Sequence, residues 1–558
     1  MTKELTSLIV DALNKVMPNS GAPDFWSYFV EQKVVFEKKE DPKFGDYACN
    51  VAMLALRAGA KELESHVGDI NILTGEKIFL TPKDLAEEIK KEIDLQKPKS
   101  IEKVEVAGPG FLNFFLSQDA FSAVVEKVLE KRDHFADSTI GQGIKINIEF
   151  ISANPTGPLH LGNGRGGFYG DSLSRLLRKC GFEVTNEYYI NDAGEQVTKL
   201  GHSIIGDSEA VYGGEYIEEL RTKMGDISDD AWEVGKEAAA LVVSDYLKPT
   251  IESGMQIRFD VWTSERALVE SGVVDRAIEK LREQGRVYED GGALWLKTRD
   301  LGDDKDRVLI KSDGNKTYFA SECGYILSKL ERGYDSIIEI WGADHHGYVN
   351  RFNVVLKALT GDESKSATFL LMQLVKLMKD GEEVRMSKRA GNVVTIDELI
   401  ERVGHDVTRF FFLQYSPDTH MTFDLGLAEE RSQKNPVYYV QYAHARMASI
   451  LEKAKNEGYD YQAADLTLLT HEKERSLIRE MLTFQDVIEL AAMESAPHRL
   501  PQLAIRLADK FHSYYGACQV IDGNAKELSE ARLALVAATK IVLGETLRLI
   551  GVSAPEKM

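Results

Sequence analysis

The segment that most restricts the fold joins a strand-like stretch to a helix-like stretch through an open loop, "ISANPTGPLHLGNGRGGFYGDSL", residues 151–173. Before this loop, Ile144, Ile146 and Ile148 alternate with polar residues, which predicts a strand. After it, apolar residues recur at helical spacing as far as Gly181, which predicts a helix that ends there. A loop so rich in glycine and proline, placed before a helix start, favours close approach of a phosphate-bearing ligand to the backbone.

The loop has two simpler explanations, a dinucleotide-binding turn and an ordinary glycine-rich loop. Gly162, Gly164 and Gly167 satisfy the GxGxxG pattern of dinucleotide-binding folds. That pattern needs its first glycine in the turn directly after the strand, whereas about a dozen residues, two of them proline, intervene here. The other explanation, an ordinary glycine-rich loop, is not favoured, because a second motif later in the chain matches the first.

The chain has 558 residues, which is more than one hydrophobic core supports, so several domains are expected. An N-terminal α+β unit precedes a central region in which strand-like and helical segments alternate, and this alternation predicts a parallel sheet. A helical insertion is expected inside the central region, and an all-α domain follows it, starting with Asn435 as N-cap before Pro436. The fold class is therefore multidomain α/β. The expected bounds are 1–118, 119–425 with the insertion at about 200–300, and 426–558.

The formal net charge of −21 argues against nonspecific DNA coating and against binding to anionic membranes. A nucleic-acid partner stays open, because binding needs local basic patches and not a basic total. The four cysteines show no CxxC spacing and are expected to be thiols of a reducing compartment: Cys49, Cys180, Cys323 and Cys518. The N-terminus lacks the pattern of a signal peptide, and no apolar run reaches membrane-spanning length. We therefore expect a cytoplasmic protein.

The second motif is "EEVRMSKRAGN", residues 382–392. Together, "PLHLGN" and "RMSKR" resemble the HIGH and KMSKS nucleotide motifs of class I aminoacyl-tRNA synthetases. Further stretches narrow the resemblance to the arginyl-tRNA synthetase family: "SANPTGPLHLGNGRGG", "YYINDAGEQ", "WGADHHGYVNRF", "HDVTRFFFL", "NPVYYVQYAHAR", "FGDYACNVAM" and "PGFLNFFL". The resemblance implies a Rossmann-type class I domain that activates L-arginine with ATP and Mg²⁺. It also implies transfer of the arginine to the 3′ end of tRNA(Arg).

For ATP, the resemblance implies that His160 contacts the phosphates and stabilises the pentavalent α-phosphate, and that Gly162 leaves room for the adenine ring. Lys388 would neutralise the leaving pyrophosphate. Two positions depart from the family pattern: Asn163 replaces the second histidine of HIGH, and Arg385 replaces the first lysine of KMSKS. The full set of expected ATP-binding residues is His160, Gly162, Asn163, Arg385, Met386, Ser387 and Lys388, with His160 and Lys388 as the catalytic pair.

A guanidinium group is planar and always charged, so its pocket should present carboxylates. Glu149 lies at the carboxyl end of the predicted strand, where open α/β sheets place ligands. The resemblance assigns Glu149 to the guanidinium and Asn154 to the α-carboxylate end of the substrate. Tyr318 and Glu322 have the i,i+4 spacing that puts both on one helix face, although the family usually has Asp at the latter position. Asp344, at the end of another predicted strand, is expected to face the ligand.

Neighbouring residues allow further interpretations. The adjacent pair His345 and His346 could indicate zinc, but consecutive side chains diverge and no third ligand has suitable spacing, so no resident metal is expected. Asn191, Asp192 and Gln196 are expected either to line or brace the pocket or to form a turn with helix caps.

In the C-terminal domain, Tyr438, Tyr439 and Tyr442 lie on one predicted helix. Core packing is favoured for Tyr438. The resemblance places Tyr439, Tyr442 and Met558 at the anticodon loop, where unpaired bases stack on aromatic rings. It also implies that the N-terminal unit contacts the outer corner of the tRNA, and a monomer is expected.

Rival functions remain at this point. A class I ligase for cysteine or glutamate would share the motifs, and a small-molecule adenylyltransferase would share the first motif but lack the all-α domain. A non-catalytic RNA-binding relative is the remaining rival. His160, Gly162 and Lys388 speak against it, because all three nucleotide-binding positions are intact.

Overall fold

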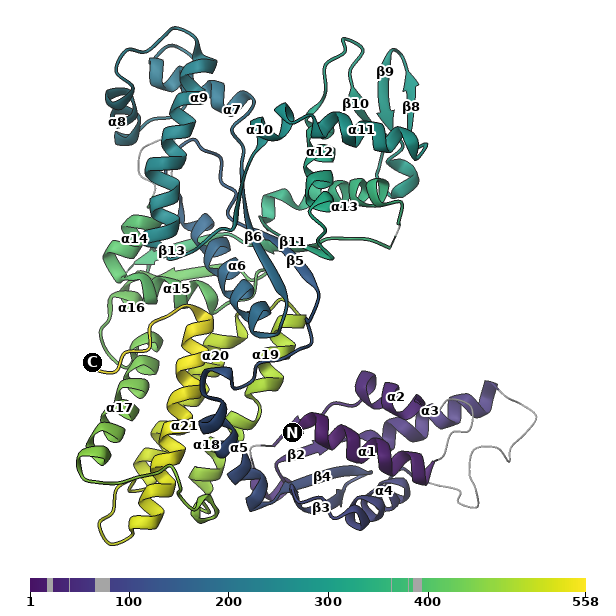
Figure 1. Cartoon of the computed structure of the whole chain (residues 1–558), viewed down its shortest axis with the longest axis vertical. Coiled ribbons are helices and arrows are strands. Elements are labelled where there is room, and N and C mark those ends of the chain that lie inside the picture. Colours follow the sequence, from purple (N-terminus) through teal and green to yellow (C-terminus); the bar gives the residue numbers. More distant parts are fainter. Residues whose placement is uncertain (18–23, 40, 66–80, 363, 380, 385–393) are drawn as a thin grey trace.

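The computed structural model describes residues 1–17, 24–39, 41–65, 81–362, 364–379, 381–384 and 394–558. Figure 1 shows three parts: an N-terminal α+β domain, a central domain built on a parallel sheet with two outward modules, and a C-terminal column of helices. Among the described residues, no helix is both long and apolar enough to cross a lipid bilayer.

The N-terminal domain is an antiparallel sheet of order β1-β2-β4-β3 packed against helices. Its strands are β1 (Glu37–Lys38), β2 (Tyr47–Cys49), β3 (Ile101–Ala107) and β4 (Phe111–Leu116). Its helices are α1 (Thr2–Val16), α2 (Phe25–Lys33), α3 (Val51–Ser65) and α4 (Pro82–Gln96), with a 3-10 helix at Pro42–Phe44. Helix α5 (Gln118–Lys131) and the 3-10 helix Arg132–His134 lead into the central domain.

The predicted parallel sheet of the central domain is confirmed, with five strands in the order β12-β11-β5-β6-β7. The strands are β5 (Lys145–Glu149), β6 (Glu183–Ile190), β7 (Val261–Ser264), β11 (Ser336–Gly342) and β12 (Thr368–Met372). From β5 the chain adds β6 and then β7 on one side, and from β11 it adds β12 on the other side. The strand order therefore reverses between β5 and β11. In such sheets, ligands bind at the carboxyl ends of the strands on either side of the reversal.

Helix α6 (Leu161–Lys179) follows β5 as predicted and ends before Gly181, which has a φ of 87°. The glycines near its start serve packing. A Cβ on Gly164 would lie 2.5 Å from the Ile396 side chain of α14 (Ile396–Val403), so a larger residue would displace that side chain.

The expectation of a helical insertion over about 200–300 requires correction. Helices do fill its first part: α7 (Glu195–Ile205), α8 (Glu215–Met224) and α9 (Ala231–Val242), with π-helical turns at Val243–Leu247 and Thr250–Gly254. The chain then returns to the main sheet as β7, and a second module follows with its own hydrophobic cluster. That module contains α10 (Glu265–Glu270), α11 (Val273–Glu283), β8 (Val287–Asp290), β9 (Ala293–Leu296), the 3-10 helix Arg299–Leu301, β10 (Arg307–Ile310), α12 (Tyr318–Glu331), the 3-10 helix Ala343–His345 and α13 (His346–Thr360). The overlooked signal is Gly291-Gly292, a hairpin turn with positive φ at both residues.

The central domain closes with a small sheet of order β14-β13-β15 and three short helices. These elements are β13 (Val375–Lys379), β14 (Glu382–Glu383), β15 (Met421–Asp424), α14, α15 (His405–Leu413) and α16 (Leu425–Glu429). The C-terminal domain is all-α, as predicted: α17 (Pro436–Asn456), the 3-10 helix Leu466–Leu468, α18 (Glu472–Leu482), α19 (Phe484–Met493), α20 (Arg499–Ala517) and α21 (Lys526–Ile550). Asn435 caps α17 as predicted, since its side chain accepts from the Val437 amide at 3.0 Å. The exact domain bounds given above stay predictions.

Candidate active site and nucleic-acid interface

The turn after β5 holds two residues in the left-handed region, Ile151 with φ 67° and Ser152 with φ 37°. Positive φ in a β-branched residue is a strained conformation that costs about 1–3 kcal/mol and is concentrated at functional sites. The turn brings the Ser152 hydroxyl back to the strand end, where it donates to Glu149 at 2.9 Å and accepts from the Tyr189 amide at 3.0 Å.

His160 is the N-cap of α6. Its Nδ1 accepts from the Gly162 amide at 3.1 Å, and its own amide donates to Oδ1 of Asn163 at 3.2 Å. Because Nδ1 is an acceptor, the proton of the neutral ring lies on Nε2, which makes Nε2 a donor suited to a phosphate oxygen. A Cβ on Gly162 would lie 3.0 Å from the His160 ring, so the glycine also keeps space for this cap.

The segment that follows the second motif lies against the first. Ile396 donates its amide to the Leu159 carbonyl at 3.0 Å, and Thr395 forms an antiparallel bridge with His160. Arg385, Met386, Ser387 and Lys388 lie outside the described residues, so their expected contacts with ATP stay predictions. The described backbone nevertheless brings the chain leaving the second motif to the helix start that carries the first.

Glu149 sits at the base of the expected arginine pocket, only 5% exposed. It accepts from Lys329 at 2.7 Å and from the Tyr325 hydroxyl. Lys329 also donates to Glu339 at 2.5 Å, on the strand beside β5. Burial alone would lower the pKa of Lys329, but the carboxylates of Glu149 and Glu339 raise it above its ordinary value. Sequence reasoning overlooked Lys329, although Glu322, Tyr325 and Lys329 share one helix face by spacing.

Glu322, one turn after Tyr318 on α12, accepts from Arg351 of α13 at 2.5 Å. The Arg351 guanidinium lies 4.3 Å from the centre of the Tyr348 ring. Burial raises the pKa of Glu322, and Arg351 opposes that rise. The Glu322 carboxylate is thus held in an ion pair within the chain.

Glu265 is a pocket residue that sequence reasoning missed. It follows β7 directly, is 9% exposed, and has its pKa raised to about 7 by burial and then by Asp192 and Glu322. Asn191, with its amide nitrogen turned toward Glu265, donates to Glu265 at 2.6 Å and to the Ala193 carbonyl at 3.2 Å, and its oxygen lies 3.1 Å from the Asn154 side chain. The signal that could have found Glu265 is its place at a strand's carboxyl end, the same signal that identified Glu149.

Asp192 accepts from the Ser264 hydroxyl at 2.7 Å and from the Arg266 amide at 3.0 Å, so it braces the start of α10. In the "NDAGEQ" stretch, Asn191 thus contacts Glu265 and Asp192 braces the start of α10, and their roles toward a ligand stay predictions. Tyr189 lies among the acidic groups, since burial and then Glu265, Glu149, Asp192 and Glu322 raise its pKa. Four carboxylates around one tyrosine suit a cationic ligand.

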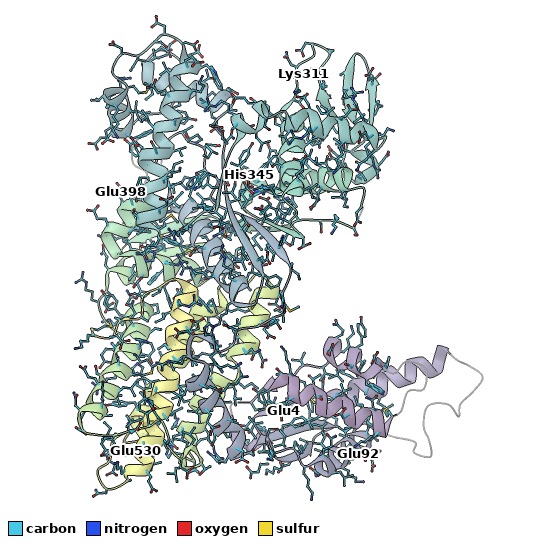
Figure 2. All side chains as sticks on the ribbon, in the orientation of Figure 1. Glu4, Glu92, Lys311, His345, Glu398 and Glu530 are labelled. Carbon is cyan, nitrogen blue, oxygen red and sulfur yellow. The ribbon has the colours of Figure 1, made fainter. Side chains whose placement is uncertain are left out.

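Asp344 does not join this cluster. After β11 the chain turns outward in the 3-10 helix Ala343–His345, and the Asp344 side chain is 84% exposed beside His345. The His345 ring lies 6.2 Å from the Trp341 ring, in the middle of the molecule in Figure 2. Within the described ranges, no three His, Cys, Asp or Glu side chains are grouped to hold a metal.

On the C-terminal domain, an aromatic face covers α17 and α20. Tyr442 is 39% exposed, and its ring is stacked on His512, at 21° between planes and 6.0 Å between centres. Tyr439 lies 4.9 Å from the same histidine, and its hydroxyl donates to Asp509 at 2.6 Å. Arg446 donates to the Tyr515 hydroxyl at 2.8 Å and lies over its ring. Sequence reasoning missed His512, Tyr515 and Arg446.

Two further tRNA expectations can be compared with the structure. Tyr438 packs against the hydrophobic core, as predicted. Met558 is 59% exposed, and the chain leading to it is held by the Pro555 carbonyl, 2.9 Å from His444.

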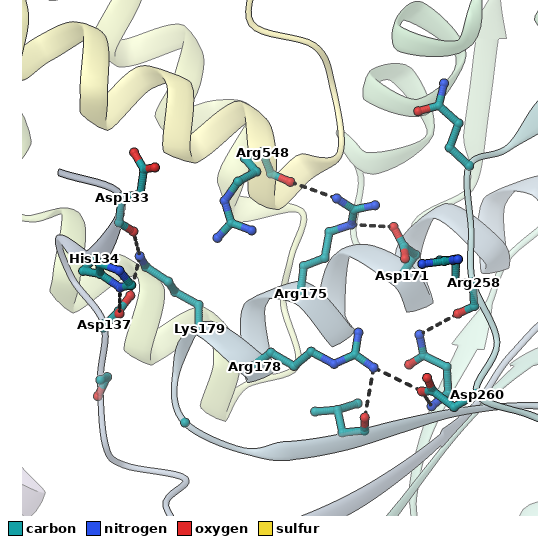
Figure 3. Close-up of a pocket in the computed structure, with 15 residues that line it drawn as sticks. Asp133, His134, Asp137, Asp171, Arg175, Arg178, Lys179, Arg258, Asp260 and Arg548 are labelled. Atoms are coloured by element: carbon teal, nitrogen blue, oxygen red, sulfur yellow. Dashed lines mark hydrogen bonds and ion pairs between the residues drawn. The ribbon is translucent and has the colours of Figure 1, made fainter.

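A cavity of about 1110 Å³ lies at the other end of α6 and is lined by charged residues of both signs (Figure 3). There Arg178 pairs with Asp260 at 3.2 Å, and Lys179 pairs with Asp137 at 2.5 Å. Because the carboxyl ends of the parallel strands lie at the opposite end of α6, this cavity is not at the position that the sequence predicts for the ligand.

Three family descriptions match the chain. An arginyl-tRNA synthetase N-terminal domain matches residues 3–116, a class I tRNA synthetase (R) catalytic domain matches 214–409, and a DALR anticodon-binding domain matches 440–558. These three matches follow the order of the three structural parts.

Comparisons over the whole chain identify relatives of the same kind. The arginine–tRNA ligase of Bacillus licheniformis is 41% identical over 547 residues, covering 94% of each chain. That of Listeria monocytogenes serotype 4b is 42% identical over 557 residues, again covering 94% of each. The arginyl-tRNA synthetase structure of Thermus thermophilus, 22% identical, superposes over 100% of both chains with a TM-score of 0.72 and so shows the fold. The chain therefore belongs to the arginyl-tRNA synthetase family of class I aminoacyl-tRNA synthetases.

Proposed function

We propose that the carboxylate cluster binds arginine and that the His160 loop binds ATP, so that the substrates meet at the carboxyl ends of β5 and β11. The protein is an arginine–tRNA ligase: arginine reacts with ATP to give arginyl-adenylate and pyrophosphate, and the arginine then passes to the 3′ end of tRNA. The observation that carries the site assignment is the buried group of carboxylates directly beside the strained turn and capped helix of the first motif.

In the first step, a carboxylate oxygen of arginine attacks the α-phosphorus of ATP, and the bond to pyrophosphate breaks. Negative charge grows on the phosphate oxygens, where the Nε2 proton of His160 and the positive end of α6 stabilise it. Lys388 is proposed to neutralise the departing pyrophosphate. Mg²⁺ is proposed to arrive with the nucleotide as MgATP, where it screens the phosphate charge.

In the second step, a terminal ribose hydroxyl of the tRNA attacks the adenylate carbonyl and AMP leaves. Tyr439, Tyr442 and Met558 are proposed to hold the anticodon loop, and His512, Tyr515 and Arg446 extend the surface on which bases could stack. The N-terminal domain is proposed to contact the outer corner of the tRNA.

The pocket also argues against the rival ligases. A glutamate substrate would bring a further carboxylate next to Glu149, Glu265 and Glu322, and like charges in a buried site repel strongly. A cysteine side chain has no charge to compensate these groups. Arginine carries the opposite charge to these groups, and its planar guanidinium suits carboxylate acceptors.

Two further properties are proposed. The protein is proposed to act as a monomer. We place the protein in the cytoplasm, because its four cysteines are buried free thiols, as is usual in a reducing compartment.

The assignment is tested by ATP–pyrophosphate exchange with tRNA present. Exchange should depend on arginine and not on glutamate or cysteine. His160→Ala should lower the exchange rate about 10²-fold or more with little change in the arginine KM, because it removes a donor to transition-state charge. The exposed His420→Ala is the matched control and should leave the rate unchanged. Normal turnover in the His160 variant would remove the basis for the ATP-site assignment.

A further inference from the structure

The loop that leads from β5 to His160 is held from outside by two tyrosine hydroxyls. Tyr188 of β6 donates to the Ala153 carbonyl at 3.0 Å. Tyr216 of α8 donates to the Thr156 carbonyl at 2.9 Å. Tyr188 is fully buried in the main sheet, whereas Tyr216 is half-buried and belongs to the first module, which consists of α7, α8, α9 and the π-helical turns after them. A module inserted later in the chain thus contacts the loop of the first nucleotide motif.

The ring of Tyr216 covers the glycine of this loop. A Cβ at Gly157 would lie 3.0 Å from that ring, so the bare glycine backbone lies directly against it. Pro155 and Pro158 stand on either side of this position, and their own rings fix their φ angles. Gly157 is therefore the backbone residue with the widest freedom on the way to His160, and Tyr216 restrains it.

The first module also contacts the chain that follows the second nucleotide motif. Thr250 donates to the Asp397 side chain of α14. The Met255 carbonyl, directly after the module, lies 3.1 Å from Nε2 of His405 on α15. In Figure 1, this end of the module lies beside α14. One module thus restrains both the loop before the first motif and the helix after the second.

We propose that Tyr216 is a positioning residue for arginine activation, which holds the loop so that His160 reaches the α-phosphate of ATP in the orientation that the reaction needs. This inference rests on the proposed function of the His160 loop. Tyr216 touches no substrate in this role. Its hydroxyl fixes the Thr156 carbonyl and its ring restrains Gly157, and both effects reach the reaction only through His160. Because a displacement of about 1 Å in a catalytic site can cost about 10²-fold in rate, such a restraint can be measured.

The first test removes only the hydroxyl group. Tyr216→Phe keeps the ring over Gly157 and loses the hydrogen bond to Thr156, so the kcat of ATP–pyrophosphate exchange at saturating tRNA should fall about fivefold. The arginine KM should stay unchanged, because the carboxylates of the pocket keep their partners. Tyr246→Phe is the matched control, since its ring lies edge-to-face on Tyr216 at 6.3 Å but its hydroxyl donates to Glu219 within the module. This control should leave kcat unchanged.

A double-mutant cycle with His160 separates positioning from general support of the fold. If Tyr216 acts through His160, Tyr216→Phe should lower kcat about fivefold in the wild-type chain and less than about 1.5-fold in the His160→Ala chain. Equal losses in the two backgrounds would overturn the proposal, and so would an unchanged kcat in Tyr216→Phe or an equal loss in Tyr246→Phe. Normal turnover in His160→Ala alone would instead count against the proposed function.

Discussion

The arginine pocket and the aromatic face of the C-terminal domain are organised in opposite ways. In the pocket, charged groups from β5, β11, α12 and α13 are paired with one another before any ligand arrives, and most are buried. On the aromatic face, side chains from α17 and α20 pack in ring pairs and remain partly open to solvent. A substitution in the pocket should therefore disturb several partners at once, whereas one on the face should remove one local contact.

The largest effect that would test this contrast is expected at Lys329, whose side chain is fully buried. Lys329→Met keeps the length of the side chain but leaves Glu149 and Glu339 without their cation. Breaking a buried pair costs about 3–5 kcal/mol of folding free energy, and the arginine KM should rise as well. Arg446→Met on the aromatic face should cost less than about 1 kcal/mol. Denaturant unfolding of both variants measures the difference, and equal costs would refute the contrast.

A smaller effect is expected at the strand end. Glu149→Gln keeps the size of the side chain and removes one charge, so the arginine KM should rise at least about tenfold, or about 1.4 kcal/mol. The ATP KM should stay nearly constant, because Glu149 contacts the loop at Ser152, at the opposite end of the loop from His160. Arginine-dependent exchange at saturating tRNA, with citrulline, canavanine and lysine as competitors, gives both constants. A normal arginine KM would show that another carboxylate reads the guanidinium.

On the aromatic face, Tyr442→Ala should raise the tRNA KM about tenfold, because a stacked base contributes about 1–3 kcal/mol. The effect should remain local, so the melting temperature should shift little and arginine and ATP affinities should be unchanged. Tyr438→Ala is an informative comparison, since that ring packs against the core and its loss should lower stability instead. An unchanged tRNA KM in a folded Tyr442 variant would remove this ring from the tRNA interface.

The smallest effect is expected for Glu322→Asp, which restores the residue usual in the family. Shortening the side chain by one methylene weakens the ion pair with Arg351, which is partly exposed. Exposed pairs contribute about 0–1 kcal/mol, so the arginine KM should change at most a few-fold. A hundredfold change in the arginine KM would show that the Glu322–Arg351 ion pair contributes directly to arginine binding.

Structural features that depend on residues close together in the sequence were predicted correctly. The strand β5, the helix α6 and the Asn435 cap follow from alternation, helical spacing and one capping residue, each of which is decided by neighbours in the chain. The strand β7 and the β8–β10 sheet were missed, because acidic helices on one side extended the helical interpretation past Gly254.

The pocket was predicted in part for a related reason. Glu149 could be found because its strand end is visible in the sequence. Lys329 lies far along the chain from Glu149, and only the β5–β11 pairing and the packing of α12 bring the two together. Asp344 was correctly placed near a strand end, but the direction of its side chain depends on a 3-10 turn that no local pattern announces.

The hydrogen bond from the Ile396 amide to the Leu159 carbonyl affects which parts of the chain can change in length during evolution. It holds the described segment that follows the second motif against the first motif, although both outward modules lie between them in the sequence. Lengthening a closed segment adds only about 0.6 kcal/mol of chain entropy for each doubling of its length. The modules can therefore differ in length with little cost in chain entropy to the contact that joins the two ends of this stretch.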